Sequence, residues 1–119
     1  MTNRKRALIV EDDPIIALDV EAELLDADWD VPGIANNINR AFELMHEHAP
    51  LVVLLDINLG QETSFDFARA CRQSGIGIVF MSGYASSVLP EDLRDETILR
   101  KPIQMSRLIE ILSACRAGA

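Results

Sequence analysis

The stretch Leu51-Val52-Val53-Leu54-Leu55-Asp56 decides the fold, because five apolar residues in succession end on a carboxylate. A run without polar alternation is typical of a strand that is covered on both faces, as in the middle of a parallel sheet. Other apolar runs predict strands over Ala7–Val10, Trp29–Ala35, Ile76–Met81 and Thr97–Leu99. Pro32, within the second of these runs, favours the edge of the sheet.

Amphipathic patterns between these runs predict helices. The first helix begins at Asp13-Pro14, a capping residue followed by the residue favoured at the first helical position. Its apolar face consists of Ile16, Val20 and Leu24, flanked by Leu18 and Leu25. Further helices are expected from Asn36 or Asn37 to Pro50, from Ser64 to Gly75 and over Met105–Arg116, with a poor, short helix interrupted by Pro90 over Ser86–Arg94. Five strands alternating with five helices predict an α/β fold with a doubly wound parallel sheet.

The bulk properties narrow the classes of protein. A length of 119 residues suits one domain, so residues 1–119 are expected to form a single domain without an output domain. The net charge of −8 argues against nucleic acid and against an anionic membrane surface as partners. The first apolar run is too short for a signal peptide or a membrane span, which favours a cytoplasmic protein. Cys71 and Cys115 lack metal-ligand spacing and are expected to be buried thiols.

Polar residues follow four of the expected strands. Glu11 and Asp12 follow the first, Asp56 the third, Ser82 the fourth and Lys101 the fifth. Parallel strands end at one edge of the sheet, which is where open α/β sheets bind ligands. Carboxylates that gather there repel one another and favour a cation, and Mg²⁺ prefers a few carboxylates together with a phosphate oxygen. The pattern therefore predicts a Mg²⁺ site and a phosphoryl group on Asp56.

Each of these residues also has a simpler interpretation when it is taken alone. Asp56 could cap a loop or helix, Ser82 could be a turn residue, and Lys101 could be a solvated surface lysine. Asp13 is expected to be only the helix cap, because Pro14 follows it. Pro102 is a candidate for a cis peptide bond after Lys101, since cis is accessible mainly before proline. Only the combination favours a phosphoryl site.

With these residues in this order, the sequence resembles the receiver domain of bacterial two-component response regulators, from about Lys5 to Arg116. The motifs that carry the resemblance are Leu8-Ile9-Val10-Glu11-Asp12-Asp13, Leu54-Leu55-Asp56-Ile57-Asn58-Leu59, Met81-Ser82-Gly83-Tyr84 and Lys101-Pro102. The resemblance implies a flavodoxin-like sheet with strand order 2-1-3-4-5.

The resemblance also implies a role for each site residue. Asp56 would accept a phosphoryl group from a histidine kinase or a histidine phosphotransfer protein. The implied Mg²⁺ ligands are Glu11, Asp12, Asp56 and the backbone carbonyl of Asn58. Ser82 and Lys101 would hold the phosphoryl oxygens. The protein would be an acceptor that catalyses its own phosphorylation and dephosphorylation, not an enzyme acting on other substrates.

A shift of Ser82 toward the new charge would change the face built from the fourth helix, the fifth strand and the last helix. That face would bind a target protein, as a monomer or a phosphorylation-dependent dimer. Receivers usually carry aromatic residues where this chain has Ile98 and Ile103. The Phe80–Tyr84 motif resembles the Phe-Ala-Thr-Gly motif of a stand-alone receiver subgroup that also lacks the switch aromatic, so Tyr84 is predicted to take over from Ile98.

Three other functions compete with this interpretation. The chain could be a receiver-like interaction module that ignores phosphorylation, although the intact acidic cluster argues against it. A phosphatase of the haloacid dehalogenase kind needs a second aspartate two residues after the nucleophile, where this chain has Asn58. Phosphotransfer through His46 or His48 would suit a helical bundle, and both are better interpreted as surface residues near a helix end.

Overall fold

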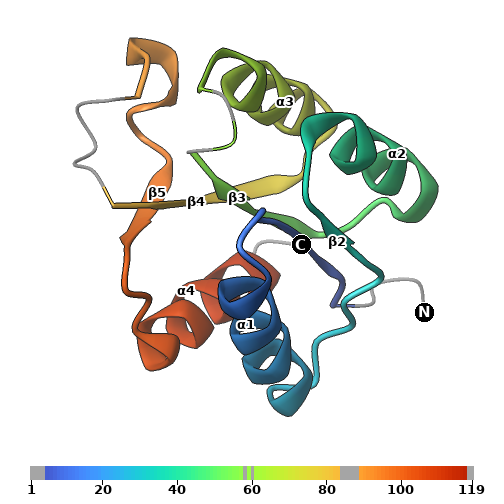
Figure 1. The fold of residues 1–119 in the computed structure, drawn as a ribbon, viewed down its shortest axis with the longest axis vertical. Coiled ribbons are helices and arrows are strands. Elements are labelled where there is room, and N and C mark those ends of the chain that lie inside the picture. Colours follow the sequence, from blue (N-terminus) through green and yellow to red (C-terminus); the bar gives the residue numbers. More distant parts are fainter. Residues whose placement is uncertain (1–4, 58, 60, 84–88, 118–119) are drawn as a thin grey trace.

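A five-stranded parallel sheet forms the centre of the molecule (Figure 1). The computed structural model describes residues 5–57, 59, 61–83 and 89–117. The strands are β1 (Ala7–Val10), β2 (Ile34–Ala35), β3 (Val52–Asp56), β4 (Gly77–Ser82) and β5 (Thr97–Arg100). Their order is β2-β1-β3-β4-β5, so the predicted doubly wound sheet and its strand order are confirmed.

The sheet is buried on both faces, as its apolar runs require. Every residue of β1 and β3 is buried. Because successive side chains of a strand point to opposite faces, Val53 and Leu55 pack into one core cluster while Val52 and Leu54 pack into the other. Strand β3, formed by the longest apolar run of the sequence, is the central strand of the sheet.

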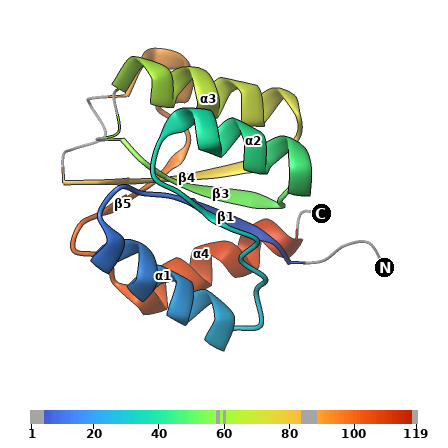
Figure 2. The same ribbon diagram turned by 45° about the vertical axis from the view of Figure 1, so that its right-hand side comes forward.

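Two helices cover each face of the sheet (Figure 2). Helices α1 (Pro14–Asp26) and α4 (Met105–Ala117) lie on one face, and α2 (Ile38–His48) and α3 (Gln61–Gln73) on the other. Val20 and Leu24 of α1 are fully buried against the sheet. In contrast, Leu18 and Leu25, which the sequence placed beside that face, are more than half exposed.

The fourth helix was expected to be short or irregular because of Pro90, and its described part is a 3₁₀ helix. Residues 84–88 lie outside the described part of the chain, and the described remainder of Ser86–Arg94 forms only the 3₁₀ helix η2 (Glu91–Leu93). Pro90 directly precedes η2. Proline has no N–H to donate within a helix, and it disfavours a helical backbone in the residue before it, so a helix cannot run through this position without a break. The described residues thus contain four α-helices instead of five.

Two element boundaries also differ from the prediction. Helix α3 begins at Gln61 rather than at Ser64, which is buried within it. Strand β2 contains only Ile34 and Ala35, and the earlier part of that run contributes a single bridge between Asp30 and Arg6. Pro32 interrupts the run because it has no N–H to donate to β1, and β2 is an edge strand as expected.

Candidate functional site

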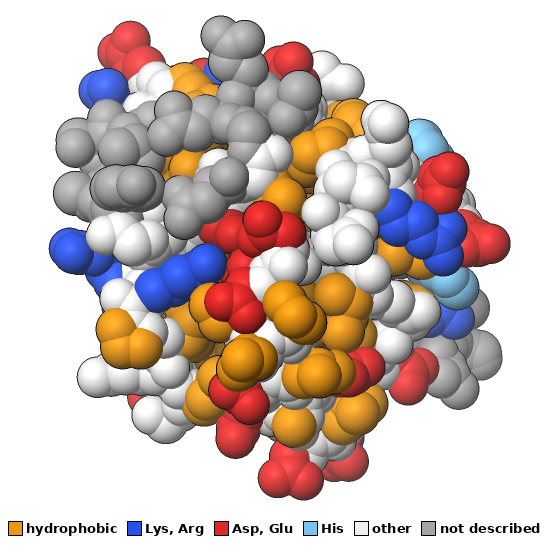
Figure 3. All heavy atoms as spheres, viewed as in Figure 1, with side chains coloured by type: hydrophobic (Ala, Val, Ile, Leu, Met, Phe, Trp, Pro, Cys, Tyr) orange, Lys and Arg blue, Asp and Glu red, His pale blue; other side chains and the backbone are white. Residues whose placement is uncertain are grey.

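The carboxyl ends of β1 and β3 bring three acidic residues together. Carboxylate oxygens of Glu11, Asp12 and Asp56 all lie within 4.8 Å of one another. The two strands are neighbours, with Val10 opposite Leu55, so the residues that follow each strand meet at one edge. Figure 3 shows acidic side chains gathered on this face of the molecule.

The start of α1 gives each acidic residue a different environment. The Asp13 side chain accepts hydrogen bonds from the backbone N–H groups of Ile15 and Ile16, so it caps the helix. Oε2 of Glu11 accepts a hydrogen bond of 3.1 Å from the Asp13 backbone N–H, which fixes the carboxylate in a buried position. Asp12 between them is exposed. The cluster thus combines one exposed carboxylate with two that are almost completely buried.

Lys101 enters the cluster from the segment after β5. Its Nζ lies 3.0 Å from Oε1 of Glu11 and 3.4 Å from Oδ1 of Asp56. Partial burial lowers the Lys101 pKa, but the contacts with Glu11 and Asp56 outweigh it, so the pKa is raised and the ammonium keeps its charge. The Lys101–Pro102 peptide bond, for which the sequence analysis expects a cis form, is cis.

Glu11 has a strongly altered acidity. Burial raises its pKa from 4.5 to about 7, and the charge of Asp56 acts in the same direction. The hydrogen bonds from the Asp13 N–H and from Lys101 oppose this rise. Such a carboxylate binds a proton near neutral pH, or a cation in its place. Oxygen ligands of this kind are the ones that Mg²⁺ selects, so the donor set fits that ion.

Ser82 lies at the end of β4, next to this cluster. Its side chain is fully buried, and its carbonyl accepts a hydrogen bond of 2.8 Å from the Lys101 backbone N–H. Asp56 pairs with Met81 across β3 and β4, so Asp56 and Ser82 occupy adjacent strand ends. The structure therefore brings together Glu11, Asp12, Asp56, Ser82 and Lys101.

Other residues singled out in the sequence have different positions. Asn58 and Tyr84 lie outside the described residues. Ile98 is partly buried against the core beneath α2 and α3, and Ile103 against the core beneath α1 and α4. His46 and His48 lie near the end of α2, at the edge where the strands begin and thus away from Asp56.

Of the two cysteines, only Cys71 has a described side chain. Cys71 is a free, buried thiol in contact with Sδ of Met45, and burial raises its pKa to about 12. Such a thiol is inert at neutral pH. The side chain of Cys115 lies outside the described set.

Two further features of the structure were not predicted from the sequence. Ile15 and Leu18 of α1 are 72% and 58% exposed, and Leu18 lines a pocket together with Glu11 and Asp12. Across the sheet, Arg69 of α3 binds both carboxylate oxygens of Asp92 in η2, at 2.8 and 3.1 Å. The helical pattern of α1 shows which residues share a face, but it does not show whether other elements cover that face. The pairing of Arg69 with Asp92 has no signal in the local sequence, because the two residues are far apart along the chain.

A family model described as the response regulator receiver domain matches residues 7–113. The chain therefore belongs to the receiver domains of response regulators, which act in two-component signal transduction. In the part of the chain that the structure describes, no helix has the length and apolar character needed to cross a bilayer.

Known relatives agree with this assignment. The transcriptional regulatory protein PdtaR of Mycobacterium tuberculosis is 29% identical over 109 residues, covering 88% of this chain and 53% of PdtaR. The chain thus spans about half the length of that relative. The BeF3-activated conformation of SdrG from Pseudomonas melonis matches with a TM-score of 0.80 and 30% identity, over 96% of this chain and 98% of SdrG.

A more distant structure shows the same fold. The receiver domain of a LuxO repressor protein from Vibrio parahaemolyticus matches with a TM-score of 0.84 and 21% identity, over 97% of this chain and 92% of that one.

Proposed function

We propose that this receiver domain accepts a phosphoryl group on Asp56 from a histidine kinase in a Mg²⁺-dependent reaction, and that the product switches protein–protein contacts. The observation that carries the proposal is the position of Asp56: a carboxylate that is 1% exposed, at the end of the central strand, with Lys101 Nζ at 3.4 Å and two further carboxylates beside it. Such a group is held in place for reaction and is not a solvated surface aspartate.

In the proposed phosphoryl transfer, one bond forms and one breaks. An Asp56 carboxylate oxygen attacks the phosphorus of a phosphohistidine, the O–P bond forms, and the N–P bond breaks with its electron pair remaining on the histidine. Lys101 holds a positive charge next to the attacking oxygen, where it attracts the oxygens of the phosphoryl group. The hydroxyl of Ser82, at the adjacent strand end, is the second group proposed to bind them.

Glu11, Asp12 and Asp56 are the residues that would hold Mg²⁺, together with the carbonyl of Asn58 that the family resemblance implies. When bound, the ion neutralises charge on the transferring phosphoryl oxygens. The residues themselves favour it: the raised pKa of Glu11 reflects crowded, buried negative charge that a cation relieves.

The relative SdrG supports this proposal, because it was solved in a BeF3-activated conformation and aligns over nearly the whole of this chain. Beryllofluoride mimics a phosphoryl group on a carboxylate, so a similar site here is expected to take both. A receiver-like module that ignores phosphorylation is the alternative, and the Asp56–Lys101 contact disfavours it.

A phosphohistidine donor must approach Asp56 from outside, because the carboxylate lies at the bottom of the site. The exposed apolar side chains of α1 border that approach (Figure 3). We propose that the kinase, or a histidine phosphotransfer protein, packs on this part of α1. A cytoplasmic location and a monomer that dimerises at most on phosphorylation belong to the same proposal.

Binding of a target protein through β5 and the last helix, here α4, also remains a proposal, with Ser82 and Tyr84 as the switch residues. The short η2 replaces a full helix on this side within the described residues, which alters that face relative to the expected one.

The test is intact mass after incubation with acetyl phosphate, with and without Mg²⁺. We expect one phosphoryl adduct in the presence of Mg²⁺, none after chelation, and none in Asp56→Asn. Asp26→Asn removes an exposed carboxylate at the far end of α1 and is expected to leave the adduct unchanged. An adduct of equal yield in Asp56→Asn would falsify the assignment of the acceptor, and no adduct under any condition favours the phosphorylation-independent module.

A further inference from the structure

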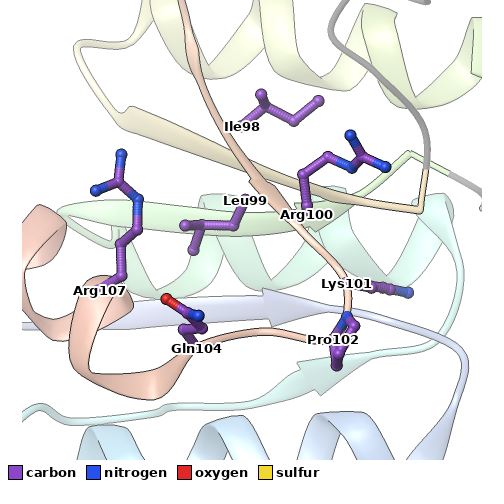
Figure 4. A pocket seen from close by; sticks show the side chains of 7 residues that line it. All are labelled: Ile98, Leu99, Arg100, Lys101, Pro102, Gln104 and Arg107. Carbon is purple, nitrogen blue, oxygen red and sulfur yellow. The ribbon is translucent and has the colours of Figure 1, made fainter.

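A groove of about 550 Å³ runs between β5 and the start of α4 (Figure 4). Ile98, Leu99 and Pro102 give it an apolar lining, and Arg100 and Arg107 give it two guanidinium groups. Arg100 projects from β5 and Arg107 from α4, while the side chain of Lys101 points away from Arg107 (Figure 4). We call this site the arginine groove.

Its two arginines differ from the others in the described part of the chain, because no described group binds their side chains. Every other arginine with a described side chain donates to a carboxylate or a backbone carbonyl. These arginines are Arg6, Arg40, Arg69, Arg72 and Arg94. Both Arg100 and Arg107 are exposed and line one groove.

The charge of the groove is opposite to that of the molecule. The chain has a net charge of −8, yet no acidic residue is among those that line the groove within the described structure. Two guanidinium groups without counter-charges beside an apolar surface attract a carboxylate-bearing ligand, since the planar guanidinium matches a carboxylate in two hydrogen bonds.

We propose, resting on the proposed binding of a target protein through β5 and α4, that the arginine groove binds an acidic segment of that partner. An aliphatic side chain of the segment would lie against Ile98 and Pro102, and flanking Asp or Glu residues would bind Arg100 and Arg107. The volume exceeds that needed for a small inorganic anion, and the apolar lining suits a side chain rather than a phosphate backbone. A second copy of this chain is disfavoured because two molecules with a charge of −8 repel each other.

The groove is also linked to Asp56, and this step rests on the proposed function. Arg100 is opposite Ser82 in the β4–β5 register and directly precedes Lys101. The Lys101 N–H donates to the Ser82 carbonyl, so the two site residues are tied to the strand that carries Arg100. Movement of Ser82 or Lys101 toward a phosphoryl group displaces the end of β5. The affinity for the acidic segment therefore changes on phosphorylation.

The test is a selection of peptides roughly twelve residues long from a random display library against the immobilised protein with Mg²⁺ and beryllofluoride. We expect enrichment of peptides with Asp or Glu around Leu, Ile or Val. The Arg100→Gln/Arg107→Gln double variant should weaken their affinity about tenfold or more. Both residues are exposed, so the variant should fold, and circular dichroism checks this.

Arg40→Gln is the matched control, because Arg40 is an exposed arginine on the opposite face of the sheet. It should leave peptide affinity unchanged. The inference is overturned if the enriched peptides are not acidic, if no peptide is enriched, or if acidic peptides bind the double variant as tightly as the parent. Concentration-dependent dimers that disappear in the double variant also overturn it, since a second copy would then fill the groove.

Two measurements separate this inference from the proposed function. Intact mass reports phosphorylation of Asp56 in the same samples, and peptide affinity is measured with and without beryllofluoride. A protein that takes the phosphoryl group but binds no acidic peptide overturns the groove and leaves the acceptor in place. Acidic peptides that bind equally in both states support recognition by the groove and overturn its link to Asp56.

Discussion

Nζ of Lys101 lies 3.0 Å from Oε1 of Glu11, and this ion pair joins the segment that follows β5 to the segment that follows β1. The two residues are on opposite sides of the central strand in the sheet order, so the pair spans the site above Asp56. The ammonium compensates buried negative charge and keeps Glu11 partly ionised, because it opposes the rise of the Glu11 pKa. Lys101 therefore has a structural task before any phosphoryl group arrives.

Replacing the Lys101 ammonium with an apolar side chain tests both its contact with Glu11 and its role in phosphorylation. We expect Lys101→Met to slow phosphorylation by acetyl phosphate about tenfold to a hundredfold, because a preorganised charge next to the attacking oxygen is lost. The pKa of Glu11 should rise above about 7. Intact mass gives the rate, and carboxyl NMR signals give the pKa. Lys5→Met is the control, since Lys5 is the other lysine and contacts Ala27 and Trp29 instead. A Lys101→Met rate equal to that of the parent contradicts the role.

The raised pKa of Glu11 predicts that the stability of the metal-free protein depends on pH. Its folded-state pKa of about 7 lies above the unfolded value of 4.5. The folded state therefore binds the proton more tightly, and this contribution is full below pH 4.5 and is lost as the pH rises to about 7. The melting temperature of the parent should fall across this window relative to Glu11→Gln, which cannot titrate. Mg²⁺ should reduce the fall, because it stabilises the carboxylate. Parallel curves for parent and variant would contradict the assignment.

The sheet was predicted well from the sequence because its strands are short, local signals. The same strand ends bring the predicted site residues together, while the roles of these residues stay predictions. Buried strands such as Val52–Asp56 are apolar runs whatever surrounds them, and the polar residue after each run is fixed at the edge by the strand itself. A short, irregular fourth helix was expected because of Pro90, but the 3₁₀ form of its described part and the hydrogen bonds of Asp92 with Arg69 and Arg72 of α3 were not predicted. That no described group pairs with Arg100 or Arg107 was not predictable either, since it depends on which side chains the fold brings near.

Arg69 anchors η2 to α3, and its removal tests how this side of the sheet is held. The guanidinium binds Asp92 through two hydrogen bonds, and neighbouring Arg72 donates to the Asp92 carbonyl at 2.6 Å. Arg69→Gln should leave the global fold intact because the pair is exposed. Amide exchange at Leu93 and Arg94 should accelerate by about threefold to tenfold, as local opening becomes easier. Arg40→Gln, which breaks an exposed pair within α2, should leave these amides unchanged. Unaltered exchange in Arg69→Gln would show that the Arg72 hydrogen bond and the packing of Leu93 hold the segment without the Arg69–Asp92 pair.

Leu18 and Leu25 offer a matched pair for locating the phosphodonor. Both are exposed leucines on α1, at 58% and 53%, but Leu18 is near the acidic cluster and Leu25 is almost two turns further along the helix. If a kinase packs on the near end, Leu18→Glu should slow transfer from a histidine kinase about tenfold, since a charge replaces an apolar contact. Leu25→Glu should have a much smaller effect.

Acetyl phosphate needs no docking surface, so its rate should be the same for both variants and the parent. Equal slowing with acetyl phosphate would mean that Leu18→Glu disturbs the site itself, and equal transfer from the kinase to both variants would place the donor elsewhere.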